Sequence, residues 1–181
     1  MRILTENTQA ILVDVQEKLF HHIYDFQNLE TNINKLLQGL MNLDIPFLIS
    51  EQYTKGLGHT ILSLRETIDS LYQPLEKMEF SCADNLTMLN KINEIGRKNI
   101  LLFGIETHVC ILQTAIDLKE KGYIPIVIED CVSSRNINDK KIAIERLKSE
   151  GVIISTMESI LFELCRVSGT DRFKSISKLV K

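Results

Sequence analysis

Short apolar segments alternate with amphipathic helical segments along the whole chain, and this alternation constrains the fold more than any other feature. Residues 10–15 (AILVDV) and 99–105 (NILLFGI) are almost continuously apolar, as expected for strands buried on both faces. A helical pattern follows the first of them, carried by Leu29, Ile33, Leu36, Leu37 and Leu40. The same criteria predict further strands at 46–50, 75–80, 124–130 and 152–155. They predict further helices near 61–71, 84–95, 107–122, 139–150 and 170–180.

Six strands separated by helices predict an α/β fold with a doubly wound parallel sheet. We expect three layers, strand order 3-2-1-4-5-6, and a single domain over residues 1–181. The chain has only 8 Gly and 3 Pro, which favours long regular elements over a loop-rich scaffold. Ser155 and Glu158 have the spacing of a capping box, which predicts the start of a helix after the last strand.

The composition argues against several classes of partner. The net charge of −3 gives no reason to expect nucleic acid or an anionic membrane. The longest apolar run is about six residues, far short of the ~20 that a membrane span needs. The first residues, MRILTENTQ, lack the apolar region of a signal peptide, so we expect a cytoplasmic protein with reduced cysteines.

Reactive side chains just beyond the carboxyl end of a strand are the first candidates for a functional site. Ligands of such sheets bind outside those ends, at the point where the strand order reverses. Asp14 ends the first predicted strand, and a carboxylate after an apolar run is costly unless it is solvated, paired or capping a helix. Lys77 lies in the third predicted strand, where a single lysine is more often a solvated surface charge. Cys110 follows the fourth strand by one helical turn.

A cysteine near a helix N-terminus is a candidate nucleophile, since free N–H groups there favour the thiolate and can hold an oxyanion. On position alone, a buried structural cysteine is the commoner interpretation of Cys110. With strands one and four adjacent, however, Asp14 and Cys110 face each other across the crevice, and Lys77 would further favour the thiolate. A base beside a nucleophile is the arrangement that covalent catalysis requires.

Other candidate residues give weaker signals. The KGLG segment lacks the spacing of a nucleotide-binding loop. His59 and His108 have no metal-ligand spacing, so we expect no metal and no cofactor. His21 and His22 are expected to be solvated. Three of the four cysteines are expected to be structural: Cys82, Cys131 and Cys165. Among these, Cys82 lies closest to Lys77 in sequence.

Three segments resemble the isochorismatase-like cysteine hydrolases, and most closely their isochorismatase-domain-containing subgroup. They are AILVDVQEKLF (10–20), LEKMEFSCADN (75–85) and the long segment from LLFGIETHVC to CVSSR (101–135). The resemblance implies a six-stranded parallel sheet between helices. It also implies an Asp-Lys-Cys catalytic triad at Asp14, Lys77 and Cys110. A non-proline cis peptide between Ile105 and Glu106 is implied as well, with an oxyanion hole formed by the N–H groups of Glu106 and Cys110.

The function that this resemblance implies is cleavage of a C–N bond in a small amide or ureido substrate through a thioester. The region after the second strand reads SEQYTKG, without the D-x-H of the metal-dependent nicotinamidases, which argues against a metal and against nicotinamide. Isochorismatases proper lack the cysteine, which argues against isochorismate. N-carbamoyl amides, ureido acids and small amides remain open. We expect a small-molecule substrate and a homo-oligomer.

Two alternatives belong to other functional classes. The chain could be a catalytically silent binding or oligomeric interaction protein on the same fold. A thiol redox protein is the third hypothesis, and the lack of a CxxC partner for Cys110 argues against it.

Overall fold

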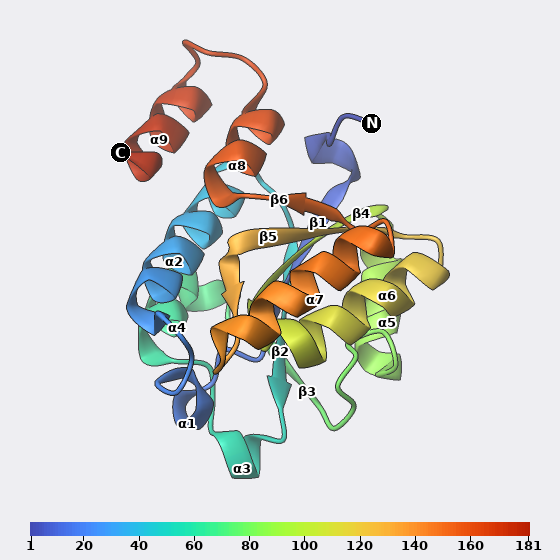
Figure 1. Cartoon of the computed structure of the whole chain (residues 1–181). Helices are drawn as coiled ribbons and strands as arrows, with labels where there is room; N and C mark the ends of the chain where they lie inside the picture. Colours follow the sequence, from blue (N-terminus) through green and yellow to red (C-terminus); the bar gives the residue numbers. More distant parts are fainter.

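One parallel sheet forms the centre of the molecule in the computed structural model, which describes all residues, Met1–Lys181 (Figure 1). The strands are β1 (Thr8–Val13), β2 (Phe47–Gln52), β3 (Pro74–Lys77), β4 (Asn99–Ile105), β5 (Ile124–Ser133) and β6 (Ile153–Ser155). Every neighbouring pair is parallel, and the order is β3-β2-β1-β4-β5-β6. The predicted doubly wound sheet and its strand order are therefore confirmed.

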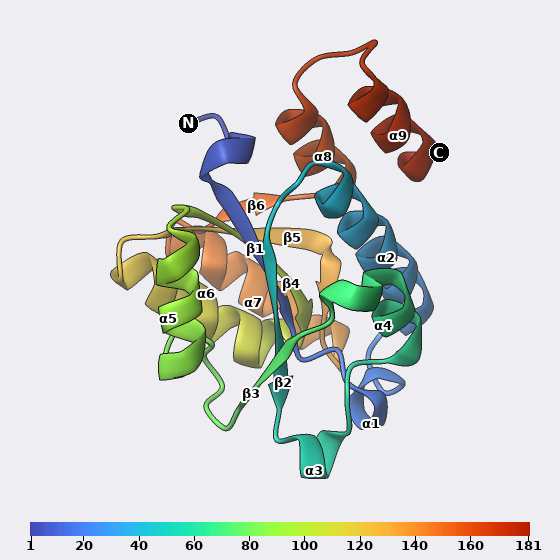
Figure 2. The ribbon, with the colours of Figure 1, turned by 180° about the vertical axis from the view of Figure 1, so that it is seen from behind.

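Helices cover both faces of this sheet, as Figures 1 and 2 show from opposite sides. The helices are α1 (Glu17–Phe20), α2 (Phe26–Asn42), α3 (Thr54–Leu57), α4 (Leu62–Ile68), α5 (Leu86–Ile95), α6 (Leu112–Glu120), α7 (Ile137–Ser149), α8 (Met157–Cys165) and α9 (Asp171–Val180). α2, α4, α8 and α9 lie on one face, and α5, α6 and α7 lie on the other. None of the helices combines the length and the apolar character that crossing a membrane requires.

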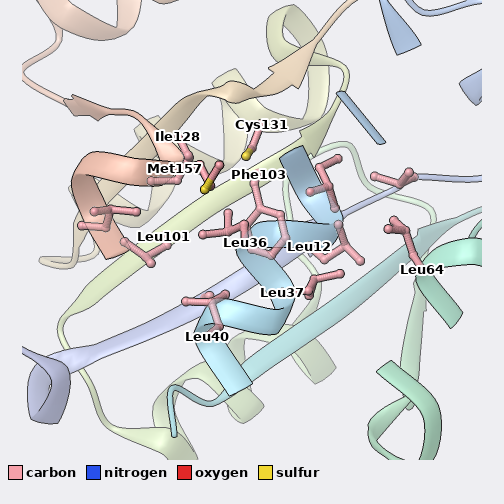
Figure 3. Packing of buried hydrophobic residues seen from close by; sticks show 14 of the residues in the cluster. Leu12, Leu36, Leu37, Leu40, Leu64, Leu101, Phe103, Ile128, Cys131 and Met157 are labelled. Atoms are coloured by element: carbon pink, nitrogen blue, oxygen red, sulfur yellow. The ribbon is translucent and has the colours of Figure 1, made fainter. Parts of the chain in front are cut away.

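The apolar runs of the central strands supply both layers of the core. In β1, Leu12 faces the α2 layer, whereas Ile11 and Val13 face the α5–α6 layer. Successive residues of a strand point to opposite faces, so a strand covered on both sides must be apolar at every position. Figure 3 shows Leu12 and Phe103 of the sheet packed against the α2 side chains Leu36, Leu37 and Leu40.

Most boundaries differ from the expected ranges by a few residues, and three of the differences lie close to the carboxyl ends of strands. β3 stops at Lys77 instead of Phe80, because the following backbone turns so that carbonyl groups reach the Lys77 ammonium. β5 continues to Ser133, beyond the expected end at residue 130. The helix expected over 107–122 begins with a π-helical turn, Thr107–Ile111, a rare geometry that is frequent at functional sites.

The predicted capping box at the start of α8 is wrong. The N-cap residue of α8 is Thr156, and its side chain makes no capping hydrogen bond. Oδ1 of Asp130, in the neighbouring strand β5, instead accepts a hydrogen bond of 2.8 Å from the Met157 N–H. A carboxylate supplied by a distant segment thus satisfies the helix start that the local motif was expected to satisfy.

Candidate active site

The carboxyl ends of β1, β3 and β4 bring Asp14, Lys77 and Cys110 together. β1 and β4 are neighbours at the point where the strand order reverses, which is where ligands bind in this class of sheet. Nζ of Lys77 lies 2.7 Å from Oδ2 of Asp14 and 3.8 Å from Sγ of Cys110. Three residues that the sequence analysis selected separately therefore form one buried cluster.

Lys77 is buried, with 1% of its surface exposed, and it is surrounded by acceptors. Besides Asp14, its ammonium contacts Oε1 of Gln52 at 2.7 Å and the carbonyl oxygens of Glu79 and Phe80 at 3.2 Å. Burial acts to lower the pKa of Lys77, but the Asp14 carboxylate and the nearby thiols outweigh burial and raise that pKa overall. The lysine therefore stays a cation inside the protein, where it can stabilise a neighbouring anion.

Asp14 lies directly after β1 in a left-handed backbone conformation, with φ of 51°. Such a conformation is uncommon outside glycine and is found most often where surrounding contacts enforce it, as at functional sites. The Asp14 N–H donates to the Ser50 carbonyl oxygen at 3.2 Å, and the Ser50 hydroxyl donates to Oδ1 of Asp14 at 2.7 Å. Both carboxylate oxygens are thus held, one by a hydroxyl and one by the Lys77 ammonium.

The Cys110 side chain lies in the π-helical turn after β4, with 6% of the residue exposed. Burial raises the pKa of the Cys110 thiol, and the Asp14 carboxylate raises it further, against the opposing effect of Lys77. The position of Cys110 near a helix start predicted a favoured thiolate. In the folded protein burial outweighs that effect, so the thiol is neutral at rest and needs a base to become a nucleophile.

Two side chains that the sequence analysis did not assign to the site complete this cluster. Ser50, in β2, connects Asp14 to Cys82, whose Sγ lies 3.6 Å from the Ser50 Oγ. Gln52, two residues further along β2, holds the Lys77 ammonium. Both follow from the same principle that selected Asp14, because they occupy the carboxyl end of a central strand. Cys82 is fully buried, and burial together with Asp14 raises its pKa to about 11.

The two remaining cysteines lie away from the cluster. Cys131 is buried in the layer between the sheet and α2, whereas Cys110 belongs to the opposite layer (Figure 3). Cys165 ends α8 and is partly exposed. All four cysteines are free thiols.

The Gly104 backbone lets β1 and β4 approach closely beside the cluster. Its φ of +121° favours glycine, and a side-chain carbon at this position would overlap the Val13 carbonyl oxygen. The next peptide bond, between Ile105 and Glu106, is cis. The backbone N–H of Glu106 donates no hydrogen bond within the protein, so one donor beside Cys110 is free for a ligand.

The side chain of Glu106 is occupied elsewhere, because its Oε1 accepts from the backbone N–H and the Nε of Arg135, at 3.1 and 3.0 Å. Nδ1 of His108 lies 2.9 Å from Oγ of Ser134. Both contacts connect the turn that carries Cys110 to the end of β5, which fixes that turn from a second strand.

The histidines are not brought together. His59 contacts the buried carboxylate of Glu51, with Nδ1 and Oε2 3.1 Å apart. Hydrogen bonds from Thr60 and the hydroxyl of Tyr72 also bind Glu51, so this carboxylate serves to hold the segment after β2. No group of three or more His, Cys, Asp or Glu side chains has an arrangement that could hold a metal ion.

A cavity of about 380 Å³ opens at the carboxyl end of β3, next to the cluster. Its lining consists of Tyr53, Lys55, Glu76, Lys77, Met78, Glu79 and Asn85. A larger cavity, about 590 Å³, lies at the amino ends of β2 and β3 and is lined by Pro46, Phe47, Pro74 and their neighbours, with no cysteine among them. The size of the first cavity suits a small molecule, and Lys77 is the member of the cluster that lines it.

A neutral thiol, a carboxylate partner and a buried ammonium form a set that can perform nucleophilic substitution at a carbonyl group. The carboxylate can accept the thiol proton, and the ammonium can stabilise the resulting thiolate. The free N–H of Glu106 can donate to a developing oxyanion.

One family model and several relatives match most of this chain. The family model described as "Isochorismatase domain" matches residues 8–159. Isochorismatase family protein 1B of Dictyostelium discoideum is 37% identical over 183 residues, covering 99% of this chain and 89% of the relative.

Solved structures share the same architecture. A structure titled as the MAR1 ribonuclease of Caenorhabditis elegans superposes with a TM-score of 0.92 at 34% identity, covering 99% of this chain and 92% of that one. YcaC of Escherichia coli, described as an octameric hydrolase of unknown specificity, reaches a TM-score of 0.92 at 20% identity, covering 99% of this chain and 89% of its own. At that identity the second likeness concerns the fold.

Proposed function

This chain belongs to the isochorismatase family, and from that premise we propose that it is a cysteine-dependent hydrolase that cleaves a C–N bond of a small amide or ureido compound. The family and the fold support a hydrolase. The observation that carries the finer proposal is the position of the Lys77 ammonium between Asp14 and Cys110, 2.7 Å from the carboxylate and 3.8 Å from the sulfur. This arrangement pairs a base with a nucleophile and keeps both out of bulk water.

In the first half of the reaction, Asp14 accepts the proton of the Cys110 thiol as the sulfur attacks the carbonyl carbon of the substrate. The Lys77 ammonium stabilises the sulfur while it carries negative charge. The N–H groups of Glu106 and Cys110 donate to the oxyanion of the tetrahedral intermediate. As the intermediate collapses, the C–N bond breaks, and Asp14 returns its proton to the departing amine. The product of this half is a thioester on Cys110.

In the second half, Asp14 accepts a proton from water, and the water oxygen attacks the thioester carbon. The C–S bond then breaks, and the sulfur regains the proton that Asp14 holds. The cycle leaves a carboxylic or carbamic acid, releases ammonia or an amine, and restores the neutral thiol. Since burial raises the pKa of that thiol, protonation of the free sulfur is favoured at the end of the cycle.

The test is ammonia release from a panel of small amides, N-carbamoyl amides and ureido acids. We expect the variant Cys110→Ala to lose activity by more than about a thousandfold, because it removes the nucleophile. Cys131→Ala is the matched control, since it removes a buried thiol from the opposite layer, and it should retain activity. Activity that persists in Cys110→Ala would exclude the mechanism.

RNA cleavage is the second candidate, because the 34% identical structure from Caenorhabditis elegans is titled as a ribonuclease. The net charge of −3 argues against it, since affinity for a nucleic-acid backbone comes mainly from basic side chains. Incubation of the wild type and Cys110→Ala with single-stranded RNA separates the candidates. Cleavage that depends on Cys110, without ammonia release from any amide, would favour the nuclease.

Four expectations from the sequence stay predictions of this proposal: a single domain over 1–181, a small-molecule substrate, a cytoplasmic location and a homo-oligomer. The alternative of a silent binding protein predicts a ligand that raises the melting temperature while no amide is hydrolysed. Intact Asp14, Lys77 and Cys110 in one cluster favour turnover over silent binding.

A further inference from the structure

A short chain of hydrogen bonds lies behind the Asp14 carboxylate, on the side away from Lys77. Sγ of Cys82 lies 3.6 Å from Oγ of Ser50, and that hydroxyl lies 2.7 Å from Oδ1 of Asp14. Cys82 and Ser50 are each 0% exposed, so no solvent replaces these contacts. The contacts connect three segments, since Asp14 follows β1, Ser50 belongs to β2 and Cys82 lies in the segment between β3 and α5.

The protons in this chain have one consistent direction. The thiol of Cys82 is protonated at neutral pH, because burial and Asp14 raise its pKa to about 11, and it can donate to the Ser50 oxygen. The Ser50 hydroxyl has a single proton, which it then donates to Oδ1 of Asp14. The second oxygen, Oδ2, accepts from the Lys77 ammonium. Asp14 therefore receives a fixed donor on each oxygen.

We propose that Ser50 is a positioning residue of the hydrolase: its hydroxyl, oriented by Cys82, holds the Asp14 carboxylate in the orientation from which it accepts the Cys110 proton. This inference rests on the proposed function. Loss of the Ser50 hydroxyl removes the donor that holds Oδ1, so the carboxylate is then fixed only through Oδ2 and the Lys77 ammonium. Transfer of the Cys110 proton should be slower from that less defined geometry.

The charged and titratable groups that face Asp14 are Lys77 from β3, Cys82 from the following segment and Cys110 from the π-helical turn. Glu51, the neighbour of Ser50, is bound to Thr60 and other side chains after β2 instead. Both thiols stay neutral through the acidic range because their pKa values are raised.

The experiment measures kcat and KM for ammonia release from the best substrate of the amide and ureido panel. We expect Ser50→Ala to lower kcat by about tenfold or more with little change in KM, because Ser50 contacts the base and not the substrate. Ser50→Thr keeps a hydroxyl and should restore the wild-type kcat. Ser133→Ala is the matched control, because it removes another buried strand-end hydroxyl, which bonds to Tyr24 at 2.9 Å.

A purely structural role of Ser50 would lower the melting temperature in Ser50→Ala and Ser133→Ala alike and leave the kcat of both variants at the wild-type value, and this result would overturn the inference. Should Ser50→Ala not fold, Cys82→Ala provides the second variant, with a smaller loss of kcat expected and an unchanged kcat counting against the inference. A wild type that releases no ammonia from any member of the panel would overturn the proposed function as well. Turnover in the wild type with an unchanged kcat in Ser50→Ala overturns the role of Ser50 alone.

Discussion

The Lys77 ammonium donates a hydrogen bond of 2.7 Å to Oδ2 of Asp14, and this pair is buried although 63 positions separate the two residues. A buried ion pair is costly to form and still more costly to break on one side only, because the remaining charge is then unpaired. The pair thus serves two roles in one place, since it joins the carboxyl ends of β1 and β3, which lie on either side of β2, and keeps a base beside Cys110.

Replacement of Lys77 by methionine should lower the free energy of unfolding by about 3–5 kcal/mol, because it leaves the Asp14 charge buried without its cation. Lys91→Met is the control. Lys91 pairs with Glu94 on the surface, and loss of that pair should cost less than about 1 kcal/mol. Urea unfolding of both variants checks this. The double variant Asp14→Asn with Lys77→Met should recover part of the loss; no recovery would contradict the unpaired-charge explanation.

Stability should fall as the pH rises above about 9. Burial raises the pKa values of the thiols of Cys82, Cys110 and Cys131, that of Cys82 to about 11 from its ordinary 9.0. In this range the unfolded chain loses thiol protons that the folded chain keeps, so the folded state binds more protons and loses stability with rising pH. The slope should be about 1.4 kcal/mol per pH unit for each thiol.

Urea unfolding at pH 7 and at steps from 9 to 11 measures this slope. Cys131→Ala removes one of the three thiols and should make the slope shallower by about a third. A wild-type free energy of unfolding that stays constant up to pH 11 would contradict the raised thiol pKa values.

Gly104→Ala should destabilise the protein by about 3 kcal/mol or more. The added carbon would overlap the Val13 carbonyl oxygen, and the positive φ adds strain. Gly122→Ala separates these two effects, because Gly122 also has a positive φ, +82°, but its Cβ would meet nothing within 4 Å. Strain alone should cost that variant about 1–2 kcal/mol. If Gly104→Ala and Gly122→Ala lose the same amount of stability in thermal unfolding, the close approach of β1 and β4 does not cause the loss in Gly104→Ala.

Asp130→Ala should cost about 1 kcal/mol or somewhat more, because it removes the acceptor of the Met157 N–H at the start of α8. Glu158→Ala should change stability by less than about 0.5 kcal/mol, since Glu158 forms no capping box with Ser155. Chemical denaturation measures the loss of unfolding free energy in both variants. A larger loss in Glu158→Ala than in Asp130→Ala would show that the Ser155–Glu158 motif caps α8.

Much of the candidate site could be predicted because its main residues occupy positions that the fold makes special. Asp14 directly follows β1 and Cys110 lies in the turn after β4, the two strands at which the strand order reverses. Lys77 was a candidate from its place in the third predicted strand, and the resemblance to the family implied its role in a triad. Ser50 and Gln52 were missed although they lie at the same edge, because a serine and a glutamine in a polar segment carry no chemical signal until their partners are known. Cys82 was correctly noted as close to Lys77, but proximity in sequence did not reveal that it bonds to Ser50.

The protonation of Cys110 illustrates a different limit. A sequence position near a helix start indicates a stabilised thiolate, but the pKa depends on how far the sulfur is removed from water and on the sign of its neighbours. Those quantities exist only in the folded chain, where burial and the Asp14 carboxylate outweigh Lys77.

The architecture could be predicted from the residues alone, because a strand covered by helices on both faces must be apolar at every position, and this pattern is local. The same pattern indicated the turn after β4 as a candidate place for a nucleophile. The groups around that nucleophile, namely the ion pair of Asp14 and Lys77 and the Ser50 hydroxyl behind it, became visible only in the folded chain, as did the cap that Asp130 provides for α8. Those contacts join residues tens of positions apart, and their energies depend on distance and burial, which no local pattern of side chains encodes.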